Sequence, residues 1–286
     1  DICDANFIDW IISENKPDLI FNFAAESHVD RSISDSNVFE KSNFLGACIL
    51  FKSAIKNGVK KFVQISTDEV YGSLPLNSKE KFRENTAFAP NVPYAATKAS
   101  GDMLCRAYFN TFRTPVIITH CSNNYGPYQY PEKLIPFFIL RILENKKLPM
   151  YGDGKNVRDW IYVLDHCEAL RLCLIKGKPG EVYNIGADNE MNNLEIADLI
   201  LRCFNRDKSW IEFVFDRPGH DRRYAINSSK IRKELSWKPK YKFGEAFRNT
   251  ITWYLKNKGW IDKVRKKTGV FNPHIDLWKG HKLKNK

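Results

Sequence analysis

The feature that most constrains the fold is a pair of short apolar runs separated by a helical pattern. Residues 18–25 (DLIFNFAA) and 61–66 (KFVQIS) are apolar, β-branched or aromatic runs of strand length, and 35–57 between them has helical spacing. Two strands joined by a helix form a βαβ unit with parallel strands. The pattern repeats, because helical spacing over about 94–112 precedes the run PVIIT at 115–119. We therefore predict an α/β fold with a doubly wound parallel sheet.

The pattern changes after about residue 130, where shorter and more varied elements follow. The sequence predicts helices at 132–145, 193–204 and 243–254, strands near 181–185 and 211–215, and a turn at Gly152-Asp153-Gly154. We interpret these elements as a smaller α/β C-terminal lobe. The predicted division is 1–128 for the sheet domain, 129–260 for a substrate lobe interleaved with it, and 261–286 for a basic tail.

Charge and cysteine content limit the classes of protein that the chain can represent. The net charge is +12, but residues 256–286 alone carry +8, which is typical of a solvated terminus rather than a nucleic-acid surface. The seven cysteines are scattered and form no CxxC pair, which argues against disulfides and a zinc site and favours a reducing cytoplasm. No apolar run approaches the roughly 20 residues of a membrane span, and no signal peptide is evident. We expect a cytoplasmic protein with no membrane anchor and no metal.

Two carboxylates follow the strand at 61–66 at once, in the sequence Thr67-Asp68-Glu69. Ligands of parallel α/β sheets bind beyond the carboxyl ends of the strands, so Asp68 and Glu69 open into the expected site. Adjacent acids in a cleft can take separate acid and base roles when their surroundings differ. Taken alone, such a pair is more often an ordinary acidic turn.

Tyr94 and Lys98 are four residues apart at the start of a predicted helix, so both side chains lie on one face. A nearby ammonium favours the phenolate and lowers the pKa of the tyrosine, which gives a base for a sugar hydroxyl. Taken alone, the spacing is more often a packed tyrosine and an exposed lysine. Its position one βα step after Thr67-Asp68-Glu69 favours the functional interpretation.

Several segments together resemble the extended short-chain dehydrogenases and, within them, the dTDP-glucose 4,6-dehydratase family. The segments are FNFAAESHVDRSI (21–33), STDEVYG (66–72), PYAATK (93–98), CSNNYGPYQYPEKLIP (121–136) and RDWIYVLDH (158–166). The resemblance runs from Asp1 to about Trp260, and Asp-Glu combined with NNYGPYQ is far more specific than YxxxK. It implies a Rossmann-type sheet, a nucleotide-sugar substrate and NAD as cofactor.

The reaction implied by the resemblance is removal of water from dTDP-glucose to give dTDP-4-keto-6-deoxyglucose. NAD⁺ would take hydride from C4, water would leave across C5 and C6, and hydride would return to C6. Tyr94 would deprotonate the C4 hydroxyl with support from Lys98, and Thr67 would hydrogen-bond the sugar near C4. Glu69 would remove the C5 proton and Asp68 would protonate the departing C6 hydroxyl. Oxidation must come first, because the C4 ketone makes the C5 proton removable.

Cofactor-binding residues follow from the same resemblance. They are Asp1 and Ile2 near the adenine, the run Phe23, Ala24, Ala25, Glu26 and Ser27, and the residues Ser42, Tyr94, Lys98 and Asn124. Ser42 stands where the family pattern has Thr, but the hydroxyl is kept. The first strand, the Gly-rich turn and the acidic ribose ligand of this fold have no match in the printed sequence, so we expect an N-terminally truncated chain whose pyrophosphate cradle lies before Asp1.

The nucleotide-sugar side also follows from the resemblance. Its residues are Ser27, Thr67, Asn123, Lys133, Leu134, Pro149, Met150, Tyr151, Arg158, Asn193, Asp216, Arg217, Pro218, Gly219 and His220. Arginine suits a diphosphate because its planar fork donates two hydrogen bonds. A surface salt bridge to Asp159 is the alternative for Arg158, and His28 is either a site residue or a packed histidine. His120 replaces the arginine usual before CSNNYG, which puts one local electrostatic contact in doubt.

Other functions stay open at this level. A nucleotide-sugar 4-epimerase or a decarboxylase of the same fold would share YxxxK, although epimerisation needs no acid for a C6 leaving group. A GDP- or CDP-sugar dehydratase differs only in the base that it recognises. A non-catalytic nucleotide-binding or nucleic-acid-binding protein is the alternative of another class. The resemblance also implies a homodimer, formed through the helices at 35–57 and 94–112.

Overall fold

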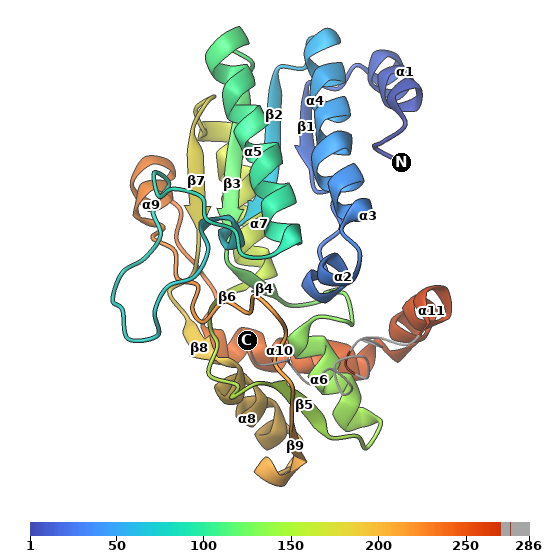
Figure 1. Ribbon diagram of the computed structural model, residues 1–286, viewed down its shortest axis with the longest axis vertical. Coiled ribbons are helices and arrows are strands. Elements are labelled where there is room, and N and C mark those ends of the chain that lie inside the picture. The colour runs from blue at the N-terminus through green and yellow to red at the C-terminus, as the bar shows by residue number, and fades with distance from the viewer. Residues whose placement is uncertain (270–274, 276–286) are drawn as a thin grey trace, which may run out of the picture.

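The computed structural model describes residues 1–269 and 275. Figure 1 shows a sheet flanked by helices in the upper half of the molecule and a smaller group of helices and short strands below it. The sheet consists of β1 (Leu19–Asn22), β2 (Lys61–Thr67), β3 (Val116–Cys121) and β7 (Val182–Ile185). These strands follow the order β1-β2-β3-β7 and are all parallel, which confirms the predicted Rossmann-type sheet.

Helices cover both faces of this sheet. One face carries α1 (Ala5–Asn15), α4 (Ala47–Lys56) and α5 (Pro93–Phe112), and the other carries α7 (Val163–Lys176) and α9 (Ser229–Leu235). Successive side chains of a strand point to opposite faces, so each strand supplies two cores. Val116 and Ile118 of β3 accordingly join the cluster beneath α4 and α5, whereas Ile117 joins the cluster beneath α7.

The lower lobe is built on one strongly apolar helix. Its elements are β4 (Asn123–Tyr125), α6 (Leu134–Leu143), β5 (Leu148–Tyr151), β6 (Val157–Tyr162), β8 (Glu190–Asn192), α8 (Asn193–Cys203), β9 (Ile211–Val214), α10 (Phe243–Lys256) and α11 (Lys258–Thr268). The α6 sequence LIPFFILRIL is apolar on most sides because β5, α8 and α10 surround it. Phe247, Ile251 and Tyr254 of α10 are buried in this core. Of the predicted basic tail, 261–268 is helical, and 270–274 and 276–286 lie outside the described residues.

The predicted helix at 35–57 is not continuous. The structure has α3 (Asn37–Phe39), a π-helical turn at Glu40–Gly46 and then α4. The wider turn directs Asn43, which is 1% exposed, towards the segment after β1. π-turns inside helices often mark functional sites, and no sequence periodicity reveals them.

Several short elements were not predicted. They are α1, α2 (Val29–Ser34), β4, β5, β6, α7, β8, α9, α11 and the 3₁₀ turns at Asp68–Tyr71 and Lys208–Trp210. Most are short, and several are set by pairing with a distant strand, as β6 is by β4 and β8. Of the elements after residue 128, β7 and α7 belong to the upper sheet, so the chain passes between the two halves more than once.

All seven cysteines are free thiols. Among residues 1–269 and 275, no helix combines the length and the apolar character that crossing a lipid bilayer would require.

Replacement of Ile117 by Ala should test the central packing of the sheet. Ile117 is 0% exposed, so Ile117→Ala should lower the free energy of unfolding by about 2–5 kcal/mol in urea denaturation. Ile175 on α7 is 59% exposed and serves as a matched control, since Ile175→Ala should stay within about 0.5 kcal/mol of the wild type. Equal effects of the two substitutions would contradict the burial described here.

Candidate active site

The carboxyl end of β2 delivers the three predicted catalytic residues Thr67, Asp68 and Glu69 in one 3₁₀ turn. Thr67 caps the turn by accepting the Glu69 backbone N–H at 3.3 Å, and its hydroxyl donates to Asp68 Oδ1 at 3.4 Å. Asp68 is 2% exposed, and its Oδ2 atom is buried with no hydrogen-bond partner among the described residues. Glu69 reaches into the cleft described below, and its Oε2 atom is likewise buried and unpartnered within the described chain. Each carboxyl group therefore has one oxygen atom available for a hydrogen bond with a ligand.

The two carboxyl groups differ in their electrostatic surroundings. Burial, followed by the nearby Glu69 carboxylate, raises the pKa of Asp68 well above its usual value. Burial also raises the pKa of Glu69, but there the cations Arg217, Arg158 and Lys133 oppose the shift. Asp68 is thus the better proton donor and Glu69 the better proton acceptor, which is the separation that acid and base roles require.

Helix α5 places Tyr94 and Lys98 on one buried face, one turn apart, with Pro93 at the first position of the helix. The Lys98 ammonium donates to the carbonyl of Ile65 on β2 at 2.7 Å, its one hydrogen bond among the described residues. The expected lowering of the Tyr94 pKa is wrong for this structure. Burial and the carboxylate of Glu69 raise the pKa of Tyr94 well above its usual value. Desolvation of the phenolate outweighs the ammonium.

The predicted cofactor strip, residues 23–27, follows β1 along the same edge of the sheet. Phe23 is 60% exposed and Ala24 is also exposed, although both directly follow the buried Asn22 at the end of β1. Asn43 fixes the backbone of this strip by accepting the N–H of Glu26 at 2.8 Å and donating to its carbonyl at 2.9 Å. Ser42 lies beside Asn43 on the π-turn and is partly buried. The sequence analysis did not identify Asn43, because its role depends on the π-turn.

Asp1 and Ile2 lie at the start of the chain, and Ile2 contacts the same π-turn. A Cβ atom on Gly46 would come within 2.6 Å of the Ile2 side chain, so this side chain packs closely on the backbone of Gly46. Asp1 is exposed and accepts the backbone N–H of Cys3 at 2.9 Å. Ile2 and Ser42 were both predicted to contact the cofactor, and the structure places Ile2 against the π-turn that carries Ser42.

Asn124, predicted beside the cofactor, is held by a histidine that the sequence analysis did not identify. His166 Nδ1 lies 2.9 Å from Asn124 Oδ1, and the Asn124 amide donates to the Ser122 carbonyl at 3.1 Å. Gln129 donates to the carbonyl of Asn124 at 2.7 Å. Burial lowers the pKa of His166 to about 4, so the ring is neutral at physiological pH and donates from Nδ1 to the amide oxygen.

A cleft of about 920 Å³, open solvent at its mouth included, lies between the two halves of the molecule. Eleven predicted residues line it, namely Glu69, Asn123, Lys133, Leu134, Pro149, Met150, Tyr151, Arg158, Asn193, Arg217 and His220. Five others predicted for the substrate do not line it, namely Ser27, Thr67, Asp216, Pro218 and Gly219. Residues that the sequence analysis did not assign also line it, among them Asp30, Glu132, Phe137, Trp160 and Tyr224. His28 is both packed, at 5% exposure, and part of the lining.

Arg158 on β6 is a buried cation aimed into this cleft. Its guanidinium carbon lies 4.1 Å from the centroid of the Tyr224 ring, and it donates to the carbonyls of Asp221 at 3.0 Å and Val157 at 2.8 Å. Stacking and backbone acceptors fix a guanidinium without cancelling its charge. The alternative of a surface salt bridge to Asp159 is wrong, since Arg158 is 5% exposed and forms no ion pair with Asp159 in the described chain.

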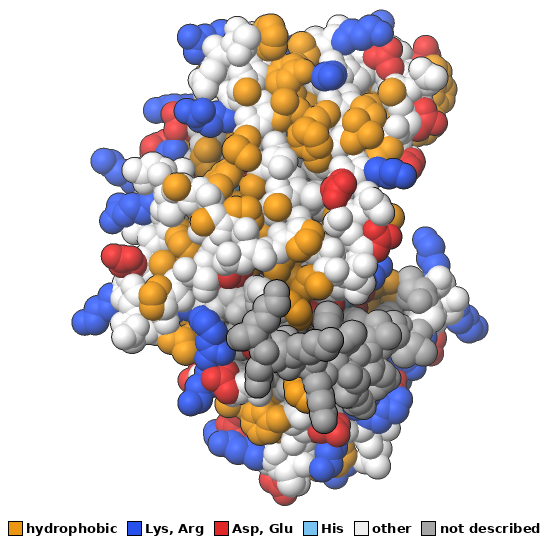
Figure 2. Space-filling view, in the orientation of Figure 1, with side chains coloured by type: hydrophobic (Ala, Val, Ile, Leu, Met, Phe, Trp, Pro, Cys, Tyr) orange, Lys and Arg blue, Asp and Glu red, His pale blue; other side chains and the backbone are white. Residues whose placement is uncertain are grey.

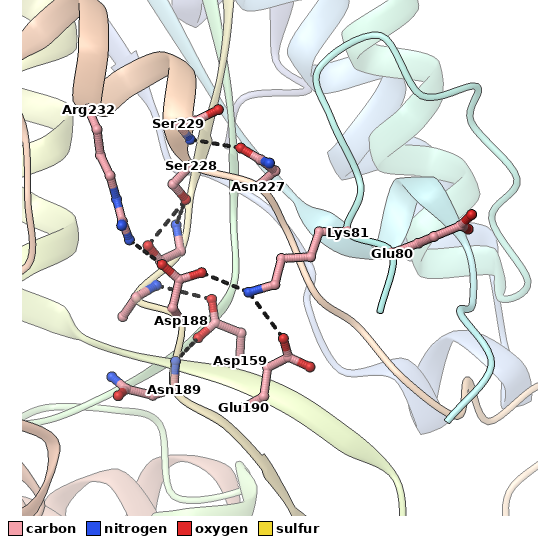
Figure 3. A network of polar contacts seen from close by, with 12 residues as sticks. Glu80, Lys81, Asp159, Asp188, Asn189, Glu190, Asn227, Ser228, Ser229 and Arg232 are labelled. Carbon is pink, nitrogen blue, oxygen red and sulfur yellow. Dashed lines mark hydrogen bonds and ion pairs between the residues drawn. The ribbon is translucent and has the colours of Figure 1, made fainter. Parts of the chain in front are cut away.

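Asp159 instead belongs to the polar network of Figure 3, which ties β6 to the segment after β7. Its carboxylate accepts the N–H of Asn189 at 2.7 Å, and burial raises its pKa to about 6. Lys81, from the connection between β2 and α5, bridges Asp188 at 2.8 Å and Glu190 at 3.2 Å. This network holds the strand that carries Arg158 in a fixed position.

The loop at 216–220 brings a second, partly buried arginine into the cleft. Arg217 lies 3.6 Å from the carboxylate of Asp30, and its Nε atom is buried with no partner among the described residues. His220 Nδ1 lies 2.6 Å from Asp216 Oδ1, while burial and the nearby Arg217 lower the pKa of His220 to about 4. Arg158 and Arg217 together make this end of the cleft suited to an anionic group such as a diphosphate.

Three features define the class of enzyme: the parallel sheet, the Tyr94–Lys98 pair at its edge, and the arginine-lined lobe below. These are the features of an extended short-chain dehydrogenase that acts on a nucleotide sugar. A family model described as GDP-mannose 4,6 dehydratase matches residues 1–250.

Curated relatives narrow this class. The chain is 45% identical to a dTDP-glucose 4,6-dehydratase of Xanthomonas campestris pv. campestris over 92% of this chain and 80% of that protein. It is 46% identical to dTDP-glucose 4,6-dehydratase 1 of Escherichia coli over 96% of this chain and 82% of that protein. The chain belongs to the dTDP-glucose 4,6-dehydratase family, which confirms the resemblance found in the sequence.

Solved structures agree with this placement. The Streptomyces venezuelae dTDP-glucose 4,6-dehydratase with NAD and TYD bound matches with a TM-score of 0.89 and 43% identity, over 92% of this chain and 80% of that one. The Thermus thermophilus UDP-glucose 4-epimerase in complex with NAD has a TM-score of 0.84 but only 26% identity, over 90% of this chain and 84% of that one. The fold is thus shared by epimerases, whereas the sequence is closer to the dehydratases.

Titration of His166 should make stability depend on pH. The pKa of the His166 ring is near 6.5 in the unfolded chain and about 4 in the folded protein. Between these pH values the unfolded chain therefore binds a proton that the folded protein does not bind. Stability should therefore fall as pH decreases from about 6.5 to about 4. His166→Gln should remove up to about 3 kcal/mol of this loss, as measured by urea unfolding across that range.

The wild type and His166→Gln share the titration of His220, so only the difference between their two curves reports on His166. Parallel curves would show that folding does not lower the pKa of His166, which would contradict its burial as a neutral ring.

Proposed function

We propose that this chain catalyses the dehydration of dTDP-glucose to dTDP-4-keto-6-deoxyglucose with NAD as cofactor. The observation that carries the proposal is the pair of the buried Asp68 and the partly buried Glu69, side by side at the end of β2 in unequal electrostatic surroundings. An elimination needs one group to take a proton and another to give one, and the pair offers both. Family membership supplies the substrate and the cofactor.

The residues present suit a bound NAD. An exposed apolar strip at Phe23 and Ala24 offers a surface to the cofactor, and Asn43 keeps its backbone in place. The Lys98 ammonium uses one of its three donors on Ile65 and has two left for a ligand. When bound, NAD⁺ supplies the reversible oxidation and reduction of the sugar carbons. The proposed contacts are those of Asp1, Ile2, residues 23–27, Ser42, Tyr94, Lys98 and Asn124.

The proton transfers are assigned to the side chains at the end of the sheet. Tyr94 takes the proton of the C4 hydroxyl, with Lys98 stabilising the phenolate and Thr67 hydrogen-bonding the sugar. Glu69 then removes the C5 proton, which the C4 ketone has made acidic, and Asp68 protonates the leaving C6 hydroxyl. Burial raises the pKa of Asp68, which favours its protonated form and suits it to the role of proton donor.

The lower lobe is assigned to the nucleotide. Arg158 and Arg217 face the diphosphate, and Lys133, which donates to the Ser27 carbonyl at 2.5 Å, adds a third cation near Glu69. Tyr151 has a buried hydroxyl with no partner among the described residues, which suits a contact with the ligand. The remaining proposed contacts are Asn123, Leu134, Pro149, Met150, Asn193, Asp216, Pro218, Gly219 and His220.

The proposal includes a homodimer and a cytoplasmic location. Figure 2 shows hydrophobic side chains gathered over α4 and α5 on one face of the molecule. The exposed apolar residues of this face include Val38, Phe44, Leu45, Met103 and Phe112. Pairing of these helices with their copies would cover the patch. The seven free cysteines support a reducing compartment.

Two substitutions should separate the acid from the base. Asp68→Asn and Glu69→Gln should each lower kcat at least about 100-fold, measured as keto-sugar formation and loss of water by mass. In deuterated water, Asp68→Asn should still exchange the C5 proton of the bound sugar, because Glu69 remains, whereas Glu69→Gln should not. Glu212→Gln, on the exposed edge of β9, is the control and should leave kcat unchanged.

Unchanged thermal unfolding and NAD content must accompany these losses. If folded, NAD-loaded wild-type protein forms no product from dTDP-glucose, the proposed reaction is wrong, and an epimerase or another nucleotide sugar becomes the better assignment.

The dimer should dissociate when charge enters the apolar face. Leu45→Glu and Met103→Glu should convert a dimer into a monomer at micromolar concentration in analytical sedimentation, because each would bury an unpaired carboxylate. Phe213→Glu is matched in exposure, at 60%, but lies on β9, and it should leave the dimer intact. A monomeric wild type would overturn this part of the proposal.

A further inference from the structure

A chain of buried polar side chains lies behind the proposed catalytic residues and takes no part in the roles assigned so far. Its centre is Asp102, which is 1% exposed and lies one turn after Lys98 on α5. Asp102 Oδ2 accepts the hydroxyl of Ser66 at 2.5 Å and lies 3.2 Å from His120 Nε2. These partners come from β2 and β3, so one carboxylate joins three elements of the sheet domain.

The far end of this chain fixes the histidine. The hydroxyl of Tyr71 lies 2.6 Å from His120 Nδ1 and donates to Asn184 Oδ1 at 2.9 Å. Asn184 in turn donates from its amide to the carbonyl of Phe82 at 3.2 Å, which fixes the direction of the amide. His120, Tyr71 and Asn184 are each 2% exposed or less. A fully buried assembly of this kind has few alternative arrangements.

The hydrogen bonds do not satisfy the whole carboxylate. Asp102 Oδ1 is buried with no hydrogen-bond partner among the described residues. An ionised carboxyl group in such a place needs a nearby cation. Besides His120, which lies 3.2 Å from Oδ2, Lys98 is a cation on the same side of Asp102, since residues four apart on a helix are neighbours on one face. Tyr94, Lys98 and Asp102 therefore form a single row on α5.

Other ionisable groups near this row do not replace Asp102. Cys105 on α5 and Cys121 on β3 also face Lys98, but burial raises the pKa of both thiols, that of Cys121 to about 12, so both are neutral. Asp68 and Glu69 act on Tyr94 rather than on Lys98. Burial lowers the pKa of Lys98, and the Asp102 carboxylate is the largest opposing influence.

We propose that Asp102 is a positioning residue of the reaction: its buried carboxylate, held by Ser66 and His120, keeps Lys98 charged and thereby supports proton removal by Tyr94. The proposal rests on the roles proposed above for Tyr94 and Lys98. Asp102 acts only through Lys98 and contacts neither sugar nor cofactor.

Asp102→Asn keeps the shape of the side chain and removes its charge. Lys98 should then lose its proton more easily and stabilise the Tyr94 phenolate less, so the acid limb of the kcat–pH profile should move up by about one pH unit. At neutral pH kcat should fall about tenfold with KM within twofold, because the sugar contacts are intact. The ionisation of Tyr94 can be followed as the ultraviolet phenolate absorbance that is lost in the Tyr94→Phe variant. In the Asp102→Asn variant the midpoint of this titration should lie at a higher pH by the same amount.

Ser66→Ala removes one of the hydrogen bonds that hold the carboxylate in place near Lys98, so the carboxylate should support Lys98 less well and the profile should shift in the same direction by less. It also keeps the test available if Asp102→Asn does not fold. Ser100→Ala, on the same helix with its hydroxyl bonded to the Ala96 carbonyl, is the control and should shift nothing.

The outcomes separate this inference from the proposed function. A wild type that dehydrates dTDP-glucose, together with Asp102 and Ser66 variants whose acid limb stays in place or moves down, would overturn the positioning role alone. A wild type without dehydratase activity would overturn the proposed function, and the phenolate titration would then still report whether Asp102 acts on Lys98 and Tyr94.

Discussion

The parallel pairing of β2 with β3 is the interaction on which the rest of the structure depends. Its register joins Phe62 to Val116 at one end and Thr67 to Cys121 at the other, so both strands end at the same edge of the sheet. The 3₁₀ turn with the two acids departs from one strand, and the segment with Asn123 and Asn124 departs from the other. Helix α5 packs across both strands and adds Tyr94 and Lys98 to that edge. One register therefore assembles side chains from three separate segments.

Burial of charge is the second organising constraint. Desolvation raises the pKa of Asp68 well above its usual value, and it raises the pKa of Glu69 less because Arg217, Arg158 and Lys133 oppose the shift. Arg158 is buried and is fixed by a ring and backbone carbonyls, which leave its charge uncompensated, whereas the partly buried Arg217 lies 3.6 Å from the Asp30 carboxylate. Unpaired buried charge costs stability, so a cleft of this kind is less stable than an apolar one. We interpret this lower stability as a consequence of keeping the site ready for an anionic ligand.

Sequence patterns predicted the sheet well, because buried strands and long helices carry strong periodicity. The family motifs predicted most of the cleft lining, since those motifs are contiguous. The motifs did not reveal the contacts of Asn43, His166 or Tyr224. The contacts of Asn43 depend on a π-turn, that of His166 with Asn124 on the packing of a helix, and that of Tyr224 with Arg158 on a late segment of the chain that returns to the cleft. The pKa direction of Tyr94 was wrong for a related reason, because sequence spacing shows a neighbouring ammonium but not how deeply the phenol is buried.

The connection between β2 and α5 has a consequence for how such enzymes diversify. Phe82 exchanges backbone hydrogen bonds with Ala225 and Asn227, and Lys81 holds Asp188 and Glu190, so a segment of the sheet domain is bound tightly to a late segment of the chain. The substrate lobe is consequently not a detachable module. If the whole lobe were transferred from one relative to another in order to change the nucleotide preference, these contacts would be lost. Specificity in this architecture can more easily change residue by residue within the cleft than by recombination of whole domains.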